Sequence, residues 1–197
     1  TNMPPKRRYQ KMDPISHVLL RSDMYAGSTH LRTIQDFIAE KTEDSYRIYQ
    51  SDISSSPAIL RIFIEPLSNA IDNVERSKST KTPSTRIKVS INQTTGETSI
   101  WNDGDIVPIE INEQENCYNH SMIFGQLLTG SNYDDEEERI VAGRNGLGSK
   151  LCNIFSKSFK VKGCDPVNKK VLEQEWTNNM RDTNGPDVKS TKLTKGY

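Results

Sequence analysis

Residues 57–78 read PAILRIFIEPLSNAIDNVERSK, and the interpretation of the whole chain starts from this stretch. Apolar residues recur every three to four positions, which predicts an amphipathic helix. Ser56 precedes the stretch as a potential N-cap, and Pro57 suits the first helical position. The stretch therefore predicts one long helix with a polar side and an apolar side.

The polar side of this helix carries an unusual set of groups. With Glu65 at zero, 100° per residue places Asp72, Asn69 and Asn73 at about −20°, +40° and +80°. Asparagine is a poor helix former, and a carboxylate with two carboxamides can orient water and hold magnesium. A plain solvated face is the alternative interpretation. The opposite side has five apolar residues that suit a core: Phe63, Leu67, Ala70, Ile71 and Val74.

A second polar group follows a predicted β-hairpin. Residues 87–91 alternate apolar and polar side chains, and residues 98–101 form the second strand after a Thr-Thr-Gly turn. Asn102, Asp103 and Gly104 come next. A carboxylate here can accept a hydrogen bond from an exocyclic amine, and glycine permits close backbone approach. The same triplet is also an ordinary turn signal.

The third group is the glycine-rich stretch from Gly143 to Lys150, GRNGLGSK, directly before another predicted helix. Glycine exposes backbone N–H groups, and a helix N-terminus favours anions. Lys150 adds a mobile positive charge for phosphate. The spacing matches neither a Walker A loop nor a dinucleotide-binding fingerprint. The acidic run at 134–138 would repel a nucleotide, so we expect it on an outward-facing loop or lid.

The remaining pattern predicts an α+β fold, with a mainly antiparallel sheet covered by helices. Asp13 and Pro14 predict a helix start, and residues 51–56 predict a polar loop. Further expected elements are a short helix at 121–128, a helix through Leu151 and Ile154, strands around 159–161 and 172–176, and a last strand at 191–194.

Composition limits the classes of function. Of 197 residues, 26 are Lys or Arg and 26 are Asp or Glu, so the zero net charge argues against a protein that coats DNA along its whole surface. Three cysteines without metal-binding spacing indicate reduced thiols. No stretch approaches the roughly 20 apolar residues of a membrane span, and we expect no membrane partner.

In this order, the three groups resemble the nucleotide site of the GHKL ATPases. A finer resemblance is to eukaryotic-type (IIA) DNA topoisomerase II, and it covers residues 9–180. It rests on four collinear segments: IFGQLLT at 123–129, SNYDD at 131–135, GRNG at 143–146 and KLCNIF at 150–155. The resemblance implies the GHKL (Bergerat) fold, a two-layer α/β sandwich with a mixed, mainly antiparallel sheet. It implies a flexible arm at 1–12 and an ATP-binding domain at 13–197, without the transducer and DNA-cleavage domains.

The resemblance also implies roles for single residues. Glu65 would be the general base, and Asn69 would hold Mg²⁺ that bridges the phosphates of ATP. Asn102, with Asp103 beside it, would hold the adenine. Further residues are expected to contact the nucleotide: Asn73, Arg76, Gly130, Ser131, Asn132, Gly143, Arg144, Asn145, Gly146, Leu147, Gly148, Ser149 and Lys150.

The sequence departs from the family pattern at three places. At one of them, Gly130 replaces a serine that is common at the ribose. Pro66 follows the expected base inside the helix, where it removes one N–H and crowds the carbonyl of Ile62 at about 3 kcal/mol or more. Ile106 stands where the family has a second glycine, and its Cβ would clash if that position needs positive φ. These departures motivate an alternative, a nucleotide-dependent dimerisation module that hydrolyses ATP poorly.

The resemblance implies an ATP-gated enzyme module that forms a homodimer when ATP is bound, and contact with DNA through the full-length enzyme. Two further interpretations stay open at this point. One is a different GHKL branch, such as a chaperone or mismatch-repair protein, and the second is a structural protein with an accidental glycine loop. The implied location is the nucleus for a cellular protein, and the cytoplasm or a virus factory for a viral one.

Overall fold

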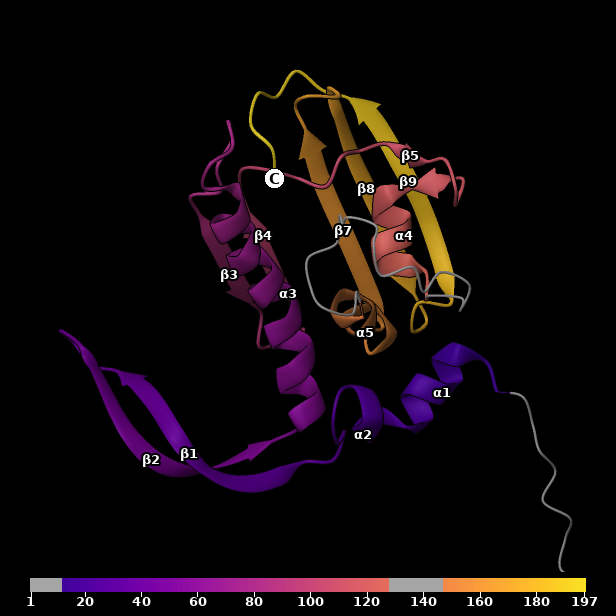
Figure 1. The fold of residues 1–197 in the computed structure, drawn as a ribbon. Helices are drawn as coiled ribbons and strands as arrows, with labels where there is room; N and C mark the ends of the chain where they lie inside the picture. The colour runs from indigo at the N-terminus through magenta and orange to yellow at the C-terminus, as the bar shows by residue number, and fades with distance from the viewer. Residues whose placement is uncertain (1–11, 128–146) are drawn as a thin grey trace, which may run out of the picture.

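The computed structural model describes residues 12–127 and 147–197 (Figure 1). The described helices are α1 (Pro14–Leu20), α2 (Ser22–Tyr25), α3 (Pro57–Ser77), α4 (Asn119–Gly125) and α5 (Gly148–Ile154). The described strands are β1 (Arg32–Lys41), β2 (Tyr46–Ser55), β3 (Ile87–Ile91), β4 (Thr98–Asn102), β5 (Ile111–Asn112), β6 (Cys117–Tyr118), β7 (Ser158–Asp165), β8 (Lys170–Thr177) and β9 (Asp182–Ser190). The expected arm at 1–12 lies outside this range except for Met12, and the acidic run at 134–138 lies wholly outside it.

The core lies where α5 and α1 meet the sheet formed by β7, β8 and β9. Its buried members are Val18, Leu151, Ile154, Trp176 and Met180. Aromatic rings continue it, because Phe159 lies with its centroid 6.1 Å from both Phe124 and Trp176. Helix α1 begins as predicted, with the Asp13 side chain accepting a hydrogen bond from the Ser16 N–H.

Helix α3 runs beside the β3–β4 hairpin and extends toward α5 (Figure 1). Its predicted existence and length are confirmed, but Ser56 makes no capping bond and instead donates its hydroxyl to the Ser28 carbonyl. The predicted division of its faces is partly wrong. Asn73 is buried on the expected polar side, whereas Ile71 is 53% exposed instead of lying in the core.

All described strand pairs are antiparallel, so the parallel pairing of a mixed sheet does not occur among the described residues. The β3–β4 hairpin and the β7–β8–β9 sheet are separate sheets. The last two residues lie between them: Gly196 accepts from the Gly104 N–H, and Tyr197 exchanges hydrogen bonds with Cys164. Residues 191–194, expected to be a strand, follow the last strand instead, since β9 ends at Ser190.

Strands β1 and β2 form a hairpin that projects away from the rest of the molecule (Figure 1). The expected polar loop at 51–56 is wrong, because residues 51–55 belong to β2. Large apolar side chains such as Phe37 and Ile48 are exposed on it. Strand β1 is exposed along nearly its whole length, and two of the half-buried positions of β2, Ser51 and Ser55, are serines. The hydrophobic alternation that identifies a strand in a sequence is therefore weak here.

The α+β class predicted from the sequence is confirmed, with helices α4 and α5 lying against the β7–β8–β9 sheet and α3 beside the β3–β4 hairpin (Figure 1). Among the helices of the described residues, none combines the length and apolar character needed to cross a membrane.

Candidate functional site

The middle of α3 packs against the first turn of α5, and this contact brings together predicted site residues far apart in the sequence. The Asn69 amide nitrogen donates to the Ser149 hydroxyl at 3.0 Å, across 80 positions of sequence. Gly148 lies directly against the Glu65 carboxylate, because a Cβ added at Gly148 would overlap Glu65 Oε2. Only a residue without a side chain allows α5 to approach Glu65 this closely.

Cys152 compensates for the proline inside α3. Pro66 has no N–H, so the Ile62 carbonyl loses its partner within the helix. The Cys152 thiol donates to that carbonyl, with a sulfur–oxygen distance of 2.9 Å. Burial and, secondly, the nearby Glu65 carboxylate raise the pKa of the Cys152 thiol to about 12, so it keeps its proton at neutral pH. The carbonyl that Pro66 leaves without a helical donor therefore receives its hydrogen bond from α5.

Glu65 is the carboxylate at this contact, and it is partly exposed. Its side chain is 21% exposed, and Oε1 forms an ion pair with Arg61 Nε at 2.5 Å, one helical turn earlier. The other oxygen, Oε2, faces Gly148. One oxygen is therefore held by a cation while the second lies toward the glycine-rich stretch, an arrangement in which it can accept a proton.

The C-terminal half of α3 is committed to internal contacts. Asn73 Nδ2 donates to the Asp105 carbonyl at 2.9 Å, and Asn73 Oδ1 accepts from Arg76 at 2.8 Å. The Ser77 hydroxyl donates to the Asn73 carbonyl and accepts from the Ser84 N–H. Asn73 therefore joins α3 to the segment after β4, and Ser77 joins it to Ser84. Arg76 supports Asn73 within the helix.

The predicted adenine side is built around Asp103 and Gly104. The Asp103 carboxylate accepts from the Thr85 N–H, the Thr85 hydroxyl and the Arg86 N–H, each at 2.8 Å. Burial raises the pKa of Asp103, but these hydrogen bonds together outweigh burial and lower it. Gly104 has φ +95°, and a Cβ there would overlap the Ser84 nitrogen. Asp103 thus holds the 84–86 segment, which leaves the adjacent Asn102 as the candidate for base recognition.

Ile106 is accommodated without backbone strain. It is not among the residues with positive φ, so the clash anticipated from the sequence does not arise. Its side chain packs toward Gly163 on β7, where an added Cβ would lie 2.8 Å from Ile106 Cδ1.

Lys150 is buried in the first turn of α5, and burial lowers the pKa of its ammonium group. The neighbouring Leu147 packs on the core cluster, so its side chain serves the fold. Seven predicted nucleotide contacts lie outside the described residues: Gly130, Ser131, Asn132, Gly143, Arg144, Asn145 and Gly146.

The donor set fits a divalent cation that is shared with phosphate. In the described part of the chain, no three His, Cys, Asp or Glu side chains are placed to hold a metal. Asn69 offers a carbonyl oxygen, because its nitrogen is the atom bonded to Ser149. Magnesium is commonly held by few protein oxygens together with nucleotide phosphates, so a single amide ligand suits it.

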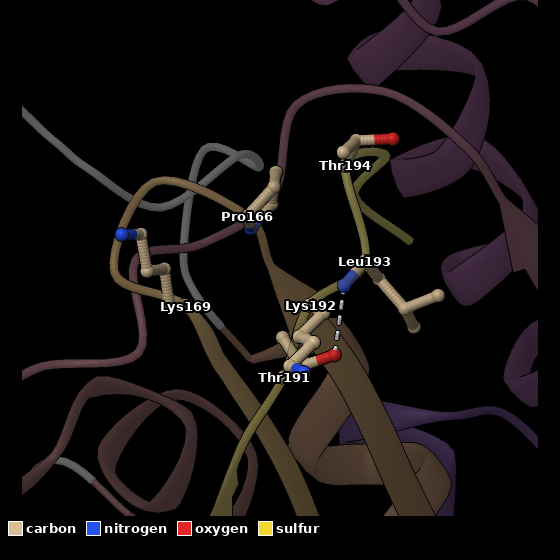
Figure 2. A pocket seen from close by; sticks show the side chains of 6 residues that line it. All are labelled: Pro166, Lys169, Thr191, Lys192, Leu193 and Thr194. Atoms are coloured by element: carbon tan, nitrogen blue, oxygen red, sulfur yellow. Dashed lines mark hydrogen bonds between the residues drawn. The ribbon is translucent and has the colours of Figure 1, made fainter.

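A cavity of about 390 Å³ lies elsewhere, between the β7–β8 turn and the C-terminal segment (Figure 2). Figure 2 shows Pro166, Lys169 and residues 191–194 around it. It contains none of the predicted site residues, and its lysines are ordinary solvent-facing cations.

Sequence reasoning missed Arg61 and Cys152 at this site. The spacing of Arg61 and Glu65, one turn apart on a predicted helix, is a signal that was sufficient to find the ion pair. Pro66 predicts an unpaired carbonyl at Ile62, but nothing in the sequence places Cys152 beside it. The partner of that carbonyl comes only from the packing of α5 on α3.

Comparison with known proteins gives a consistent assignment, although no protein-family model matches this sequence. The chain is 43% identical to DNA topoisomerase 2 of Invertebrate iridescent virus 6 over 98% of its own length and 18% of that protein. It is 41% identical to the Plasmodium falciparum DNA topoisomerase 2 over 94% of its length and 13% of that protein. The chain therefore spans less than a fifth of these relatives.

Solved structures support the same family as the sequence relatives do. The ATPase region of Saccharomyces cerevisiae topoisomerase II matches with a TM-score of 0.83 and 38% identity, over 95% of this chain and 49% of that one. The ATPase and transducer domains of the Balamuthia mandrillaris enzyme match with a TM-score of 0.83 and 36% identity, over 98% and 49%. The fold agrees with these matches, and the chain belongs to the DNA topoisomerase 2 family, within its GHKL ATPase region.

Proposed function

We propose that this chain binds ATP with Mg²⁺ and serves as the ATP-hydrolysing module of a type IIA DNA topoisomerase. One observation carries the proposal: α5 brings Gly148 and Ser149 of the glycine-rich stretch against Glu65 and Asn69 of α3. A base, an oxygen ligand and a phosphate-binding stretch thereby meet at one place, as hydrolysis of a phosphoanhydride requires.

In the proposed reaction, Glu65 accepts a proton from a water molecule whose oxygen forms a bond to the γ-phosphorus. The bond from that phosphorus to the ADP oxygen breaks as charge moves onto the leaving group. Lys150 and the backbone of residues 143–149 hold the phosphates, while Asn102 recognises the adenine. Magnesium, when bound through Asn69 Oδ1, would neutralise negative charge on the phosphates.

The roles of the whole protein extend this proposal. We infer that two copies dimerise when ATP is bound, and that the complete enzyme uses this gate for ATP-dependent passage of double-stranded DNA. A module that dimerises without efficient hydrolysis is the second candidate. Pro66 and Ile106 are the reasons to consider this second candidate, and both are weaker in the structure. The carbonyl freed by Pro66 is bonded to Cys152, and Ile106 does not have positive φ.

Calorimetric titration with a non-hydrolysable ATP analogue, in Mg²⁺ or in EDTA, tests the proposed site. The wild-type chain is expected to bind more tightly in Mg²⁺, and Asn69→Ala is expected to lose that gain. Glu75→Ala, at an exposed position near the end of the same helix, is the matched control and should behave as wild type. Absence of binding by folded wild-type chain, or an intact magnesium gain in Asn69→Ala, would contradict the proposal.

A further inference from the structure

We propose that Ser149 is a positioning residue for Asn69, which it orients so that the amide oxygen faces the cation. This inference rests on the proposed magnesium–nucleotide function, and it adds a role for a hydroxyl group that no phosphate contact requires. The observation behind it is the 3.0 Å hydrogen bond in which Asn69 Nδ2 donates to Ser149 Oγ.

The two ends of an asparagine amide are nearly the same size but differ in chemistry. The oxygen can coordinate a divalent cation, whereas the NH₂ group is a donor and cannot. An amide that presents its nitrogen to the site would therefore repel the cation. In the observed bond the Ser149 hydroxyl accepts from Nδ2, which leaves Oδ1 free for the cation. Because a hydroxyl can also donate, the bond restrains the amide in this orientation rather than excluding the reverse one.

Ser149 is suited to be that acceptor because its own position is fixed by α5. Gly148 before it packs against the Glu65 side chain, and Cys152 one turn later donates to the Ile62 carbonyl. These two contacts set the register of α5 on α3, which places the Ser149 hydroxyl opposite Asn69. Both partners are partly buried, so water competes less for the bond than it would on an open surface.

Asn69 has no second described contact that would fix its amide. No hydrogen bond to its Oδ1 is found between residues 12 and 127 or between 147 and 197, and its nitrogen has only the bond to Ser149. Asn73 differs, since both ends of its amide are held by other groups. Among the described residues, the Asn69 amide is therefore restrained by one hydroxyl group.

The test compares Ser149→Ala with Ser149→Thr by titrating the ATP analogue in Mg²⁺ and in EDTA. Removing the support of a metal ligand lowers metal affinity about 10- to 100-fold, so Ser149→Ala should lose about tenfold of the affinity gained from Mg²⁺. Its affinity in EDTA should match wild type, because the phosphate contacts remain. Ser149→Thr retains the hydroxyl and should restore the gain.

Ser156→Ala is the matched control. Ser156 follows the end of α5 and donates to the Cys152 carbonyl, so the variant removes a serine hydroxyl beside the same helix without touching Asn69. It should leave the affinity unchanged in both Mg²⁺ and EDTA. Circular dichroism and thermal unfolding verify that each variant is folded.

Two outcomes would overturn the inference alone: a full magnesium gain in Ser149→Ala, or an equal loss of affinity in Mg²⁺ and in EDTA. The second outcome would assign Ser149 to phosphate binding or to folding. If the wild-type chain shows no magnesium gain, or Asn69→Ala keeps it, then the proposed function fails and the inference fails with it. The wild-type and Asn69→Ala titrations therefore distinguish the two failures.

Discussion

The two halves of α3 carry similar polar residues but use them differently. Toward β4, Asn73 is bonded at both ends of its amide, and Asp103 beyond it accepts three hydrogen bonds from the 85–86 backbone and side chain. Toward α5, Asn69 has one described hydrogen bond, and Glu65 Oε2 lies against a bare glycine. Polar groups with all their bonds made stabilise the fold, whereas groups with an atom still available can act on a ligand.

The two glycines that serve these halves provide the largest test of this difference. Gly104→Ala forces positive φ on alanine and drives its Cβ into the Ser84 backbone, which cannot move aside. We expect it to lower the free energy of unfolding by about 2–4 kcal/mol. Gly148→Ala meets mainly the Glu65 side chain, which can rotate away, so we expect a loss of about 1 kcal/mol.

The functional effects of the two substitutions should not follow their stability effects. Gly148→Ala displaces the Glu65 carboxylate and α5, so analogue binding should weaken while most of the stability is retained. Urea denaturation of both variants, followed by calorimetry on the folded chains, measures the two quantities. If Gly148→Ala is the more destabilising substitution, then the half of α3 toward β4 is not the structural half, and the half toward α5 is not the ligand-binding half.

The bond between Cys152 and Ile62 gives the next largest expected effect. Cys152→Ala removes the thiol and leaves the partly buried Ile62 carbonyl without a partner, at a cost of about 1–3 kcal/mol. Pro66→Ala restores a helical N–H for that carbonyl, so Cys152→Ala should cost about 1 kcal/mol less in the Pro66→Ala background. Cys152→Ser keeps a hydrogen-bond donor, so its free energy of unfolding should lie between those of wild type and Cys152→Ala.

A double-mutant cycle in urea measures this coupling directly. Cys164→Ala is a useful comparison, since Cys164 is equally buried but lies on β7 away from α3. Its cost should be the same in the wild-type background and in the Pro66→Ala background. Additive costs for Cys152→Ala and Pro66→Ala would contradict compensation of the proline by the thiol.

The comparison also explains what the sequence could predict. Helix α3, the β3–β4 hairpin and α5 follow from hydrophobic periodicity, and the family resemblance predicts that Glu65, Asn69 and the 147–150 stretch lie together, as they do in the structure. The commitment of Asp103 to Thr85 and Arg86 could not be predicted, because both an adenine amine and a backbone N–H suit a carboxylate. Only the folded structure shows which donor reaches it.

The predictions for the β1–β2 hairpin and for Ile71 are wrong for a related reason. Helical periodicity assigns Ile71 to an apolar face, but which part of that face is covered depends on the elements packed around α3. In β1 almost every residue is exposed, and in β2 serines occupy two of the half-buried positions, so hydrophobic alternation is weak in both sequences. Local patterns predict elements well, and they predict contacts only where one partner is possible.

Lys150 allows a smaller test on the α5 side, through pH. Burial lowers its pKa below the 10.5 of a free lysine, and phosphate binding favours the protonated form. Analogue affinity should therefore fall as the pH rises through the lowered pKa of Lys150 in the unliganded chain. Titrations from neutral to alkaline pH measure the slope, and Lys150→Gln should remove most of it. An equal slope in Lys150→Gln would assign the dependence to another group.

Substitution of Asp103 has the smallest expected effect, a change in how stability depends on pH, and it tests the half of α3 that faces β4. Its pKa in the folded chain lies below the unfolded value of 3.8, since the hydrogen bonds from Thr85 and Arg86 outweigh burial. The carboxylate therefore contributes stability that is fully present above pH 3.8 and is lost as the pH falls through the lowered folded pKa. Asp103→Asn should be less stable than wild type at neutral pH, and the difference should shrink as both are acidified. Urea midpoints across this range measure it, with Asp72→Asn on the exposed side of α3 as control. If Asp103→Asn instead matched wild type in stability at neutral pH and lost analogue affinity, then Asp103 would be a ligand-binding group, and the β4-facing half of α3 would not be the purely structural half of the site.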